Sequence, residues 1–323
     1  MDFVAINIQI ELRGYIKMKE ISFVVIAYNE EKHILETLRS ILDQKSLSNY
    51  EVIVVNDGSK DNTSKLVHEF INKKNYVKLI NNIINKGRGF ARQIGILNAK
   101  GKYIAFVDAD IILPKNWLEK VLPQMKFFDA AGGIAIPDGD STYICQKFLL
   151  NPKPLPHTYG ITGSNSIYKS NIFNKIIVDP NLRGGEDVDI LLKMVQSGCR
   201  IKLLDNLIVS HREDITFKKS LKRMFSFGKG ATNLLNFYKK IRIPDLSFFL
   251  FVILFVNAIY FSIYRNFYFI YLFVIYPLFV SYLHLFKKFK FEKAWAFVFG
   301  GLFNYFMILS YFIGRIAGYF SKE

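Results

Sequence analysis

The sequence predicts an α/β domain with a mostly parallel sheet, followed by an all-α membrane anchor. In the first two thirds of the chain, short apolar runs alternate with amphipathic stretches, and three of the runs end in acidic residues. Beyond Leu246 the chain becomes rich in Phe, Tyr and Ile and almost free of acids. The 323 residues are 51% hydrophobic and 16% aromatic, more than a purely soluble protein usually carries. Four parts are therefore expected: an extension at 1–17, a globular domain at 18–215, a basic segment at 216–245 and an anchor at 246–320.

The first strand and helix are expected directly after the extension. Residues 21–27 (ISFVVIA) form a continuous apolar run of the kind found in buried strands. Asn29 is then placed to cap a helix whose first turn carries Glu30 and Glu31 against the helix dipole. The inner stripe of this helix recurs at helical spacing: Ile34, Leu35, Leu38, Ile41 and Leu42.

Three more strands follow with the same alternation. Ser59 or Asp61 is expected to cap the helix after the second strand, and a further helix at about 89–99 precedes the fourth. Strands that alternate with helices at this spacing favour a parallel sheet with helices on both faces. These three strands are expected at 52–56, 77–80 and 103–107.

Acidic residues stand at the carboxyl ends of the predicted strands, where ligands of such sheets bind. The first strand is followed by Glu30, the second by Asp57, and the fourth by Asp108 and Asp110. A dinucleotide-binding sheet would carry a glycine-rich turn after its first strand, but the sequence there reads AYNEEK. Carboxylates repel nucleotide phosphates unless a divalent cation lies between them. The acids therefore predict a nucleotide site that uses Mg²⁺ or Mn²⁺.

Four stretches resemble the motifs of glycosyltransferase family 2, in the family's order and spacing, between residues 21 and 211. They read VVIAYNEEKHILETLRSI, EVIVVNDGSKDNT, NKGRGFARQIGILNAKGKYIAFVDADI and GGEDVDILLKMVQSGCRI. The resemblance implies a Rossmann-like domain of the GT-A fold and the activity of a hexosyltransferase in glycan biosynthesis. Such an enzyme transfers a sugar from a nucleotide-diphosphate donor with inversion at the anomeric carbon.

The resemblance also implies where the donor and its metal ion bind. Asp108 and Asp110 match the family's DXD pair and are both candidate metal ligands. Asp110 is the stronger candidate, and Asp108 would lie nearer the ribose. His211 would supply a further metal ligand, as a histidine does in some GT-A enzymes. The cation would neutralise charge on the leaving diphosphate. The implied donor-binding residues are Tyr28 and Glu30 near the base and ribose, Asp57 on the base, Arg92 at the diphosphate, and Asp108 and Asp110.

The later motifs imply the acceptor side. Asp187, at a helix start, resembles the family's catalytic base, which takes the proton of the acceptor hydroxyl as the anomeric bond forms. Acids at a helix start also occur simply because they complement the helix dipole. Glu186 would orient or cap. Three small or polar residues resemble the stretch that faces the donor sugar and acceptor: Gly163, Ser164 and Asn165.

One motif of the family is missing. Processive polysaccharide synthases carry QxxRW after the base, whereas the comparable region here reads SLKRMF. Its absence favours an enzyme that adds a single sugar. The expected acceptor is membrane-bound, either a lipid-linked saccharide with a free hydroxyl or a polyprenyl phosphate. A phosphate acceptor is already anionic and needs no base, so a functional Asp187 favours the hydroxyl.

The net charge of +16 is compatible by itself with either nucleic acid or anionic lipid as a partner. The position of the charge decides against nucleic acid, because Lys and Arg crowd the segment at 216–245, interleaved with Phe and Leu. This mixture predicts an amphipathic helix on anionic headgroups, although an ordinary solvated basic face has the same composition. Cys145 and Cys199 have neither metal-ligand spacing nor a disulfide-rich setting and fit a reducing cytoplasm.

Three membrane-spanning helices are expected, at about 246–264, 266–286 and 294–313. The first range has 19 residues without a charge, close to the roughly 20 that cross a hydrocarbon core. The positive-inside rule places the Lys-rich loop at 287–293 in the cytoplasm. Counting back through two spans places the globular domain there as well, which predicts a multi-pass membrane protein with a cytoplasmic catalytic domain.

Two other classes of protein fit part of the pattern. A catalytically inactive membrane protein that binds nucleotide-sugars would keep the strand-end acids without needing Asp187. It would not release nucleotide when acceptor is added. A membrane scaffold that uses only its basic face would need none of these acids, so Asp110→Ala would leave it intact.

Overall fold

The structure is a computed structural model that describes residues 19–44, 49–71, 74–138, 163–182, 184–212, 216–238, 243–263, 268–288 and 294–320. The predicted extension at 1–17, Cys145 and most of the Lys-rich loop lie outside these ranges. The chain divides into two compact units. The first comprises Met1–Ile136, Tyr159–Asn181 and Glu186–His211, and the second comprises Pro137–Thr158, Leu182–Gly185 and Arg212–Glu323.

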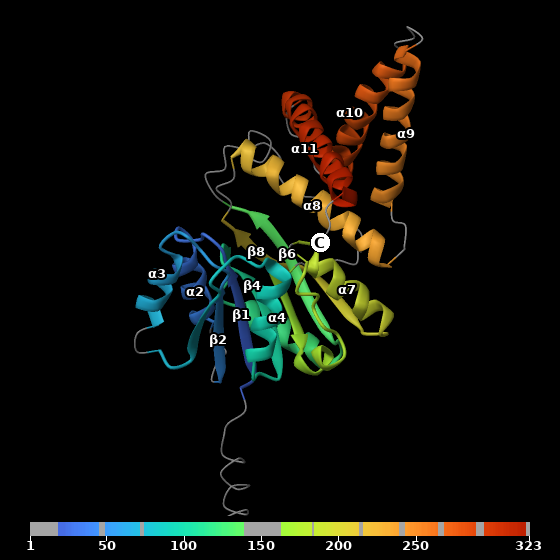
Figure 1. The fold of residues 1–323 in the computed structure, drawn as a ribbon. Coiled ribbons are helices and arrows are strands. Elements are labelled where there is room, and N and C mark those ends of the chain that lie inside the picture. Colours follow the sequence, from blue (N-terminus) through green and yellow to red (C-terminus); the bar gives the residue numbers. More distant parts are fainter. Residues whose placement is uncertain are drawn as a thin grey trace, which may run out of the picture. The chain divides into compact units, whose positions relative to one another are not determined.

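One eight-stranded sheet forms the core of the first unit, with the strand order β3-β2-β1-β4-β7-β6-β8-β5 (Figure 1). β1 coincides with the first predicted strand, and β2, β3 and β4 extend the other predicted strands by one or two residues. The strands are β1 (Ile21–Ala27), β2 (Tyr50–Asn56), β3 (Val77–Asn81), β4 (Tyr103–Asp108), β5 (Ile111–Ile112), β6 (Ala130–Pro137), β7 (Asn165–Lys169) and β8 (Ile201–His211).

The sheet is mixed, which corrects the expectation of a mostly parallel sheet. β1 pairs in parallel with β2 and β4, and β2 pairs in parallel with β3. In contrast, β7 is antiparallel to β4 and β6, and β5 is antiparallel to β8. β5 follows β4 after only Ala109 and Asp110, a link too short for the crossover that a parallel neighbour requires. β5 does not pair with β4; its partner is β8, a strand from much later in the chain.

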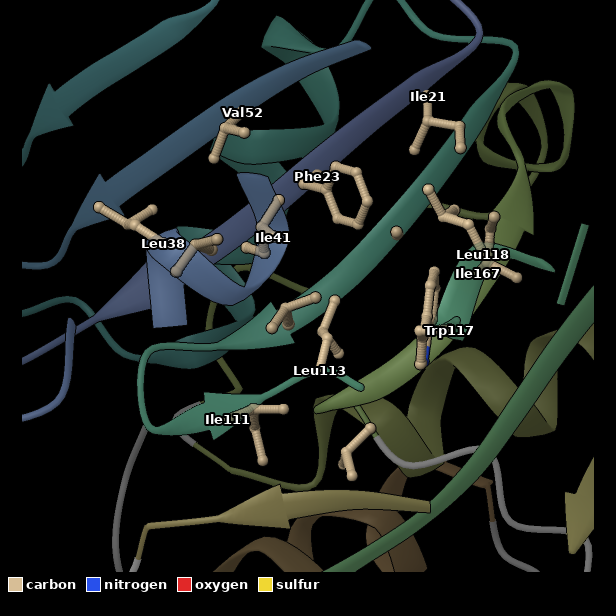
Figure 2. Packing of buried hydrophobic residues seen from close by; sticks show 14 of the residues in the cluster. Ile21, Phe23, Leu38, Ile41, Val52, Ile111, Leu113, Trp117, Leu118 and Ile167 are labelled. Carbon is tan, nitrogen blue, oxygen red and sulfur yellow. The ribbon is translucent and has the colours of Figure 1, made fainter. Parts of the chain in front are cut away.

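The helices of the first unit are α2 (Ile34–Leu42), α3 (Thr63–Ile71), α4 (Arg88–Asn98), α5 (Trp117–Val121) and α7 (Glu186–Gln196), with 3₁₀ turns η1 (Leu122–Lys126) and η2 (Ser170–Asn174). They cover both faces of the parallel strands, as predicted. Phe23 and Val25 pack into one apolar cluster with α2 and α3, whereas Val24 and Ile26 pack into another with α4 and α7. Figure 2 shows the first cluster, in which the rings of Phe23 and Trp117 lie 6.2 Å apart.

The chain between β1 and α2 differs from the prediction. The N-cap position of α2 is His33, not Asn29. Asn29 has a left-handed φ of 57°, and its Oδ1 accepts a hydrogen bond from the Lys60 N–H at 2.8 Å. The N–H of Asn29 donates to Ser59 Oγ at 2.9 Å. Asn29 therefore ties the end of β1 to the turn after β2, and the acids that follow it stay in a loop at the edge of the sheet.

Of the two residues predicted to cap the helix after β2, Asp61 does so. Its Oδ1 accepts a hydrogen bond from the N–H of Thr63, the first residue of α3, at 3.0 Å. Ser59 is instead engaged by Asn29. The two turns that follow β1 and β2 thus support each other at the edge of the sheet.

Four helices make up most of the described part of the second unit (Figure 1): α8 (Phe217–Tyr238), α9 (Ile243–Ile263), α10 (Tyr268–Lys288) and α11 (Ala294–Phe320). Helices therefore occupy the described residues of all three ranges predicted as spans. Among the described residues, one helical segment is long and apolar enough to cross a membrane, Asp245–Ile263, and a shorter apolar segment lies at Ile270–Leu283. Three spans and a multi-pass topology stay predictions.

The predicted basic segment is packed against another helix of the second unit. α9 and α11 pack through Phe248, Phe251 and Phe312. They are also joined by a fully buried ion pair, in which Arg315 Nη1 donates to Asp245 Oδ1 at 2.5 Å. α8, which contains most of the basic segment, packs along α11. One side of α8 is therefore covered by protein, and contact of its basic residues with anionic headgroups stays a prediction.

Candidate active site

The acids that follow β1, β2 and β4 lie at one edge of the sheet, as predicted. β1 lies between β2 and β4, and it is parallel to both. Parallel neighbours present their carboxyl ends at the same edge, so Glu30, Asp57 and Asp108 follow adjacent strand ends. Tyr28 lies in the same loop as Glu30 and is 42% exposed. This edge is the candidate active site.

Asp57 is buried and holds the loop that leads into α4. Its Oδ2 accepts a hydrogen bond from the Gly87 N–H at 2.8 Å. Its Oδ1 accepts from the Lys86 N–H at 3.1 Å and from the side-chain amide of Asn82 at 2.8 Å. Both carboxylate oxygens are thus engaged by the protein. Contact of Asp57 with a nucleotide base stays a prediction.

Arg92 does not take the position expected of a diphosphate ligand. Its side chain is 1% exposed and lies among three protein acceptors. Nη2 donates to Asp108 Oδ1 at 2.9 Å, Nε donates to Glu186 Oε1 at 3.0 Å, and Nη1 donates to the carbonyl of Gly163 at 2.7 Å. A side chain at Gly163 would collide with this guanidinium, which explains the glycine. The guanidinium of Arg92 is therefore buried and engaged by protein acceptors, which argues against its predicted contact with the diphosphate.

The pKa values of Arg92 and Asp108 are shifted more by neighbouring charges than by burial. Burial alone would lower the pKa of Arg92, but the charges of Asp108 and Glu186 outweigh it and hold the pKa above its usual range. Burial alone would raise the pKa of Asp108, but the charges of Arg92 and Arg88 hold it below its usual range. Arg92 and Asp108 are therefore both ionised at neutral pH.

The pairing of β5 with β8 brings His211 beside Asp110. Ile111 is paired with His211 across the antiparallel ladder, so the residue before β5 lies next to the end of β8. His211 Nε2 and Asp110 Oδ2 are 2.9 Å apart, and both side chains are partly exposed. The predicted association of these two residues is present in the structure.

Fewer side chains than predicted are placed to bind a metal ion. Among the described residues, no group of three or more His, Cys, Asp or Glu side chains converges closely enough to hold an ion. Asp108 is bound by Arg92, whereas Asp110 and His211 contact each other. The buried Oδ1 of Asp110 has no hydrogen-bond partner. One or two protein ligands completed by substrate phosphates are typical of Mg²⁺ sites, so this pair fits a divalent cation.

Glu30 belongs to the same acidic group. Burial, followed by the negative charges of Asp110 and Asp108, raises the pKa of Glu30 to about 8. Its backbone is fixed, because the Glu30 N–H donates to Thr63 Oγ1 at 2.8 Å. In the metal-free protein the folded state therefore keeps a proton on Glu30 that the unfolded chain releases near pH 4.5.

Glu30→Gln is expected to stabilise the metal-free protein at alkaline pH. Because the folded-state pKa is raised, this group destabilises the protein progressively as the pH rises from about 4.5 to about 8. The variant should match the wild type near pH 4.5 and exceed its free energy of unfolding by about 2–4 kcal/mol above pH 8. Thermal unfolding of the full chain in chelator, across this range, is the measurement. The exposed Glu119→Gln is the control, and a difference that does not vary with pH would contradict the assignment.

Asp187 lies in the first turn of α7, beside the loop at Gly163. The N–H of Gly163 lies 3.5 Å from Asp187 Oδ2, and the Val188 N–H donates to Oδ1 at 2.9 Å. Asp187 is partly exposed, whereas its neighbours Glu186 and Asp189 are buried. Of the three acids in this turn, Asp187 is the one that a substrate can reach, as a general base requires.

Asn165 is closed to a substrate, which corrects the prediction that it faces the acceptor. Its side chain is fully buried. Trp117 Nε1 donates to Asn165 Oδ1 at 2.7 Å, and Asn165 Nδ2 donates to the carbonyl of Leu207 at 3.0 Å. Ser164 is also buried. Asn165 therefore links β7 to α5 and β8. Of the three residues at 163–165, Gly163 is the one whose N–H lies near Asp187.

Arg88 is a residue of the site that the sequence motifs do not single out. It begins α4 and is exposed. Partial desolvation lowers the pKa of its guanidinium, but the charges of Asp108 and Glu186, with that of Asp187, raise it above the usual range. The signal in the sequence is an arginine between two glycines at a helix start. Arg88 places an accessible cation at the acidic edge.

Comparison with known proteins gives consistent matches for the first unit. Residues 22–177 match the model of a family described as Glycosyl transferase family 2. The chain is 34% identical over 147 residues to dolichyl-phosphate beta-glucosyltransferase ALG5C of Trichomonas vaginalis, which covers 43% of this chain and 44% of that protein. It is 34% identical over 204 residues to poly(ribitol-phosphate) beta-N-acetylglucosaminyltransferase TarS of Staphylococcus aureus, which covers 58% of this chain and 35% of that protein. The aligned segments thus span less than half the length of these relatives.

A solved structure shows the same fold. The mannosyltransferase PcManGT from Pyrobaculum calidifontis, in complex with GDP-Man and Mn²⁺, is similar over 70% of this chain and 66% of that chain, with a TM-score of 0.56. The sequence identity is 16%, so this is a likeness of fold. The mixed sheet, with helices on both faces, is consistent with the GT-A architecture.

Proposed function

We propose that this chain, whose residues 22–177 match the model of glycosyltransferase family 2, transfers one sugar from a nucleotide-diphosphate donor to a hydroxyl of a membrane-bound, lipid-linked acceptor. The observation that carries the proposal is one buried network. Arg92 binds Asp108 at the donor edge and the carbonyl of Gly163, and the N–H of Gly163 faces Asp187. The reachable base and the donor edge are thus held in one rigid arrangement.

Asp187 acts as the general base in this proposal. Its carboxylate takes the proton of the acceptor hydroxyl while the acceptor oxygen bonds to the anomeric carbon. The bond from that carbon to the diphosphate breaks in the same step, and its electrons stay on the leaving phosphate. Attack from the face opposite the leaving group inverts the anomeric centre.

Asp110 and His211 would hold the divalent cation. When bound, Mg²⁺ or Mn²⁺ neutralises the charge that develops on the leaving diphosphate. The partnerless Oδ1 of Asp110 is the available ligand atom, and the contact with His211 fixes the orientation of the carboxylate. The Mn²⁺ in the complex of the mannosyltransferase PcManGT supports the choice of ion.

Arg88 approaches the diphosphate in place of Arg92. The guanidinium of Arg92 is buried and engaged by three acceptors, whereas Arg88 is exposed at the start of α4. An arginine that remains charged at all accessible pH values suits a phosphate group, which it can bind with two parallel hydrogen bonds. Tyr28 and Glu30 directly follow the end of β1, and we place the base and ribose beside them.

The second unit and the names of two relatives support the proposed acceptor and location of the enzyme. The segment Asp245–Ile263 has the length and composition of a membrane span. The name of the Trichomonas relative gives a dolichyl phosphate as the lipid, and that of TarS gives a poly(ribitol-phosphate). Both names support a large, phosphate-containing acceptor, and Asp187 favours a hydroxyl as the attacking group. The Lys-rich loop at 287–293 supports three spans with the catalytic domain in the cytoplasm. A polyprenyl-phosphate sugar synthase is the alternative.

A screen of nucleotide-sugars tests the proposed function. Thermal unfolding of the full chain in detergent is followed with UDP-glucose, UDP-N-acetylglucosamine or GDP-mannose, in Mn²⁺ and in chelator. A true donor at 100 times its Kd stabilises the folded state by about 2.7 kcal/mol, and the effect should require the metal. The stabilising donor is then tested for transfer to lipid-linked saccharides and to polyprenyl phosphate. Stabilisation without transfer to either would favour a nucleotide-sugar-binding protein.

Asp110→Asn is expected to weaken metal-dependent binding of the stabilising nucleotide-sugar by roughly tenfold or more. Removal of one negative ligand lowers the affinity for a divalent cation at a site open to solvent. The fold should be retained, because the Asp110 side chain is partly exposed and asparagine has nearly the same shape. Calorimetric titration in Mn²⁺ gives the affinity, with the exposed Asp205→Asn as the control. Unchanged affinity in Mn²⁺, or full activity in chelator, would contradict the assignment.

A further inference from the structure

α8 presents one of its sides to α11. Successive residues of an α-helix are turned by about 100°, so Leu221, Phe225, Gly228 and Thr232 fall on one side. Ser310 Oγ of α11 donates to the carbonyl of Leu221 at 2.7 Å, and Thr232 Oγ1 donates to the carbonyl of Arg315. A side chain at Gly228 would collide with the backbone of α11. This side of α8 is therefore fixed against α11 by close backbone approach.

The opposite side of α8 contacts a different segment of the second unit, the pair Gly184 and Gly185. Gly230 is turned by about 200° from Gly228, and Leu234 follows Gly230 one turn later. A Cβ at Gly230 would lie 2.7 Å from the carbonyl oxygen of Gly184, too close to be accommodated without movement. The Cδ1 of Leu234, which is buried, lies 3.3 Å from where a Cβ of Gly185 would be. α8 thus lies between α11 and the Gly184–Gly185 loop.

This loop needs external support to hold one conformation. Gly185 has a φ of +85°, which residues other than glycine rarely adopt. A Cβ at Gly184 would meet no atom of the described residues within 4 Å, so no packing restrains Gly184 on that side. Two successive glycines have more backbone freedom than any other pair of residues. The described contacts that restrain them come from α8, and Glu186 and Asp187 follow directly in the chain.

We propose that Gly230 and Leu234 are positioning residues for the general base: α8, fixed on its other side by α11, holds the Gly184–Gly185 loop in the conformation that sets Asp187. The proposal rests on the proposed function in taking Asp187 as the base. Its consequence is that the chemical step depends on helix packing in the second unit, whereas donor binding does not. The donor-side acids follow β1, β2 and β4 and are held by the sheet.

The test compares Gly230→Ala with Ser226→Ala, a substitution at an exposed position of the same helix. Hydrogen–deuterium exchange of the full chain in detergent reports on the backbone at 184–190. We expect at least fivefold faster exchange of these amides in Gly230→Ala and no change in Ser226→Ala. Unchanged exchange in Gly230→Ala would overturn the proposal, whatever the activity of the protein.

A second readout separates positioning from general damage to the enzyme. With the nucleotide-sugar that stabilises the wild type as the probe, kcat for transfer should fall at least tenfold in Gly230→Ala. The donor KM and the donor Kd should stay within threefold. Equal loss of donor affinity and kcat, or faster exchange with unchanged kcat, would overturn the proposal. If the wild type transfers no sugar, faster exchange still supports the restraint of the loop, and it is the proposed function that fails.

Leu234→Ala covers the case in which the added methyl group prevents folding. Leu234→Ala removes the side chain that packs on Gly185 and adds no volume. It therefore loosens the Gly184–Gly185 loop, whereas Gly230→Ala displaces it. The same pattern is expected, with faster exchange at 184–190, lower kcat and unchanged donor affinity. A variant that folds and exchanges like the wild type would refute the role of this contact.

Discussion

Asp187→Asn is expected to lower sugar transfer by roughly 10²–10⁴-fold, the usual contribution of a positioned general base. Asparagine has nearly the same shape but cannot accept the proton of the acceptor hydroxyl. Nucleotide-sugar affinity should be retained, because the acids at the ends of β1, β2 and β4 are unchanged. The measurement is single-turnover transfer to a lipid-linked saccharide, together with donor affinity by calorimetric titration.

The choice of acceptor makes this experiment report on substrate class as well. A polyprenyl phosphate is already anionic, so its transfer should fall only slightly in Asp187→Asn. The exposed Asp205→Asn controls for the loss of a charge at the surface of the same unit. Wild-type turnover of the variant on the hydroxyl acceptor would refute the assigned role. Loss of donor binding would mean that Asp187 is a donor ligand or supports the fold.

Arg92→Met is expected to destabilise the protein by about 3–5 kcal/mol, the usual effect of removing one partner from a buried ion pair. Methionine fills part of the volume but leaves the carboxylates of Asp108 and Glu186 buried without their cation. Glu186 is the more affected, since its Oε2 is already buried without a hydrogen-bond partner. Denaturant unfolding of the full chain gives the free energy, with the exposed Arg39→Met as the control.

Removing the unpaired charge of Glu186 tests why Arg92→Met is destabilised. If the destabilisation comes from unpaired charge, the double variant Arg92→Met with Glu186→Gln should recover part of the lost free energy. Arg92→Lys should be intermediate, because an ammonium carries the charge but cannot span three acceptors as the planar guanidinium does. A double variant that is no more stable than Arg92→Met would point to packing against Phe106, whose ring lies 4.9 Å from the guanidinium.

The parallel half of the sheet is predictable from the sequence because its strands are continuous apolar runs separated by amphipathic helices. β1 is predicted to the residue for this reason, and the acids that follow the strands are located by the same pattern. The antiparallel half leaves no such signal. β5 has only two residues, and its partner β8 alternates between buried and exposed positions. Pairing across this distance is decided by tertiary contacts that no local pattern reports.

The errors at individual site residues have a common physical cause. A polar side chain next to a strand end can face a ligand or complete the protein's own hydrogen bonding, and residue type does not distinguish the two. Asn165 and Arg92 turn inward, where carbonyl groups and carboxylates of other elements need donors. Asn29 joins a neighbouring turn because its backbone adopts a left-handed conformation. Arg88, which stays exposed, is distinguished only once the structure shows which acids surround it.

The ladder between β5 and β8 has a consequence for the order in which the protein is made. Asp110 emerges from the ribosome about a hundred residues before His211, its partner in the structure. The strands β1 to β4 can pair as soon as they are synthesised, but the two-residue β5 has no partner until β8 follows. The proposed binding of a metal ion by Asp110 and His211 together would therefore become possible only late in biosynthesis, when nearly the whole first unit is present. A ribosome-bound fragment that ends before β8 contains Asp110 without its partner His211.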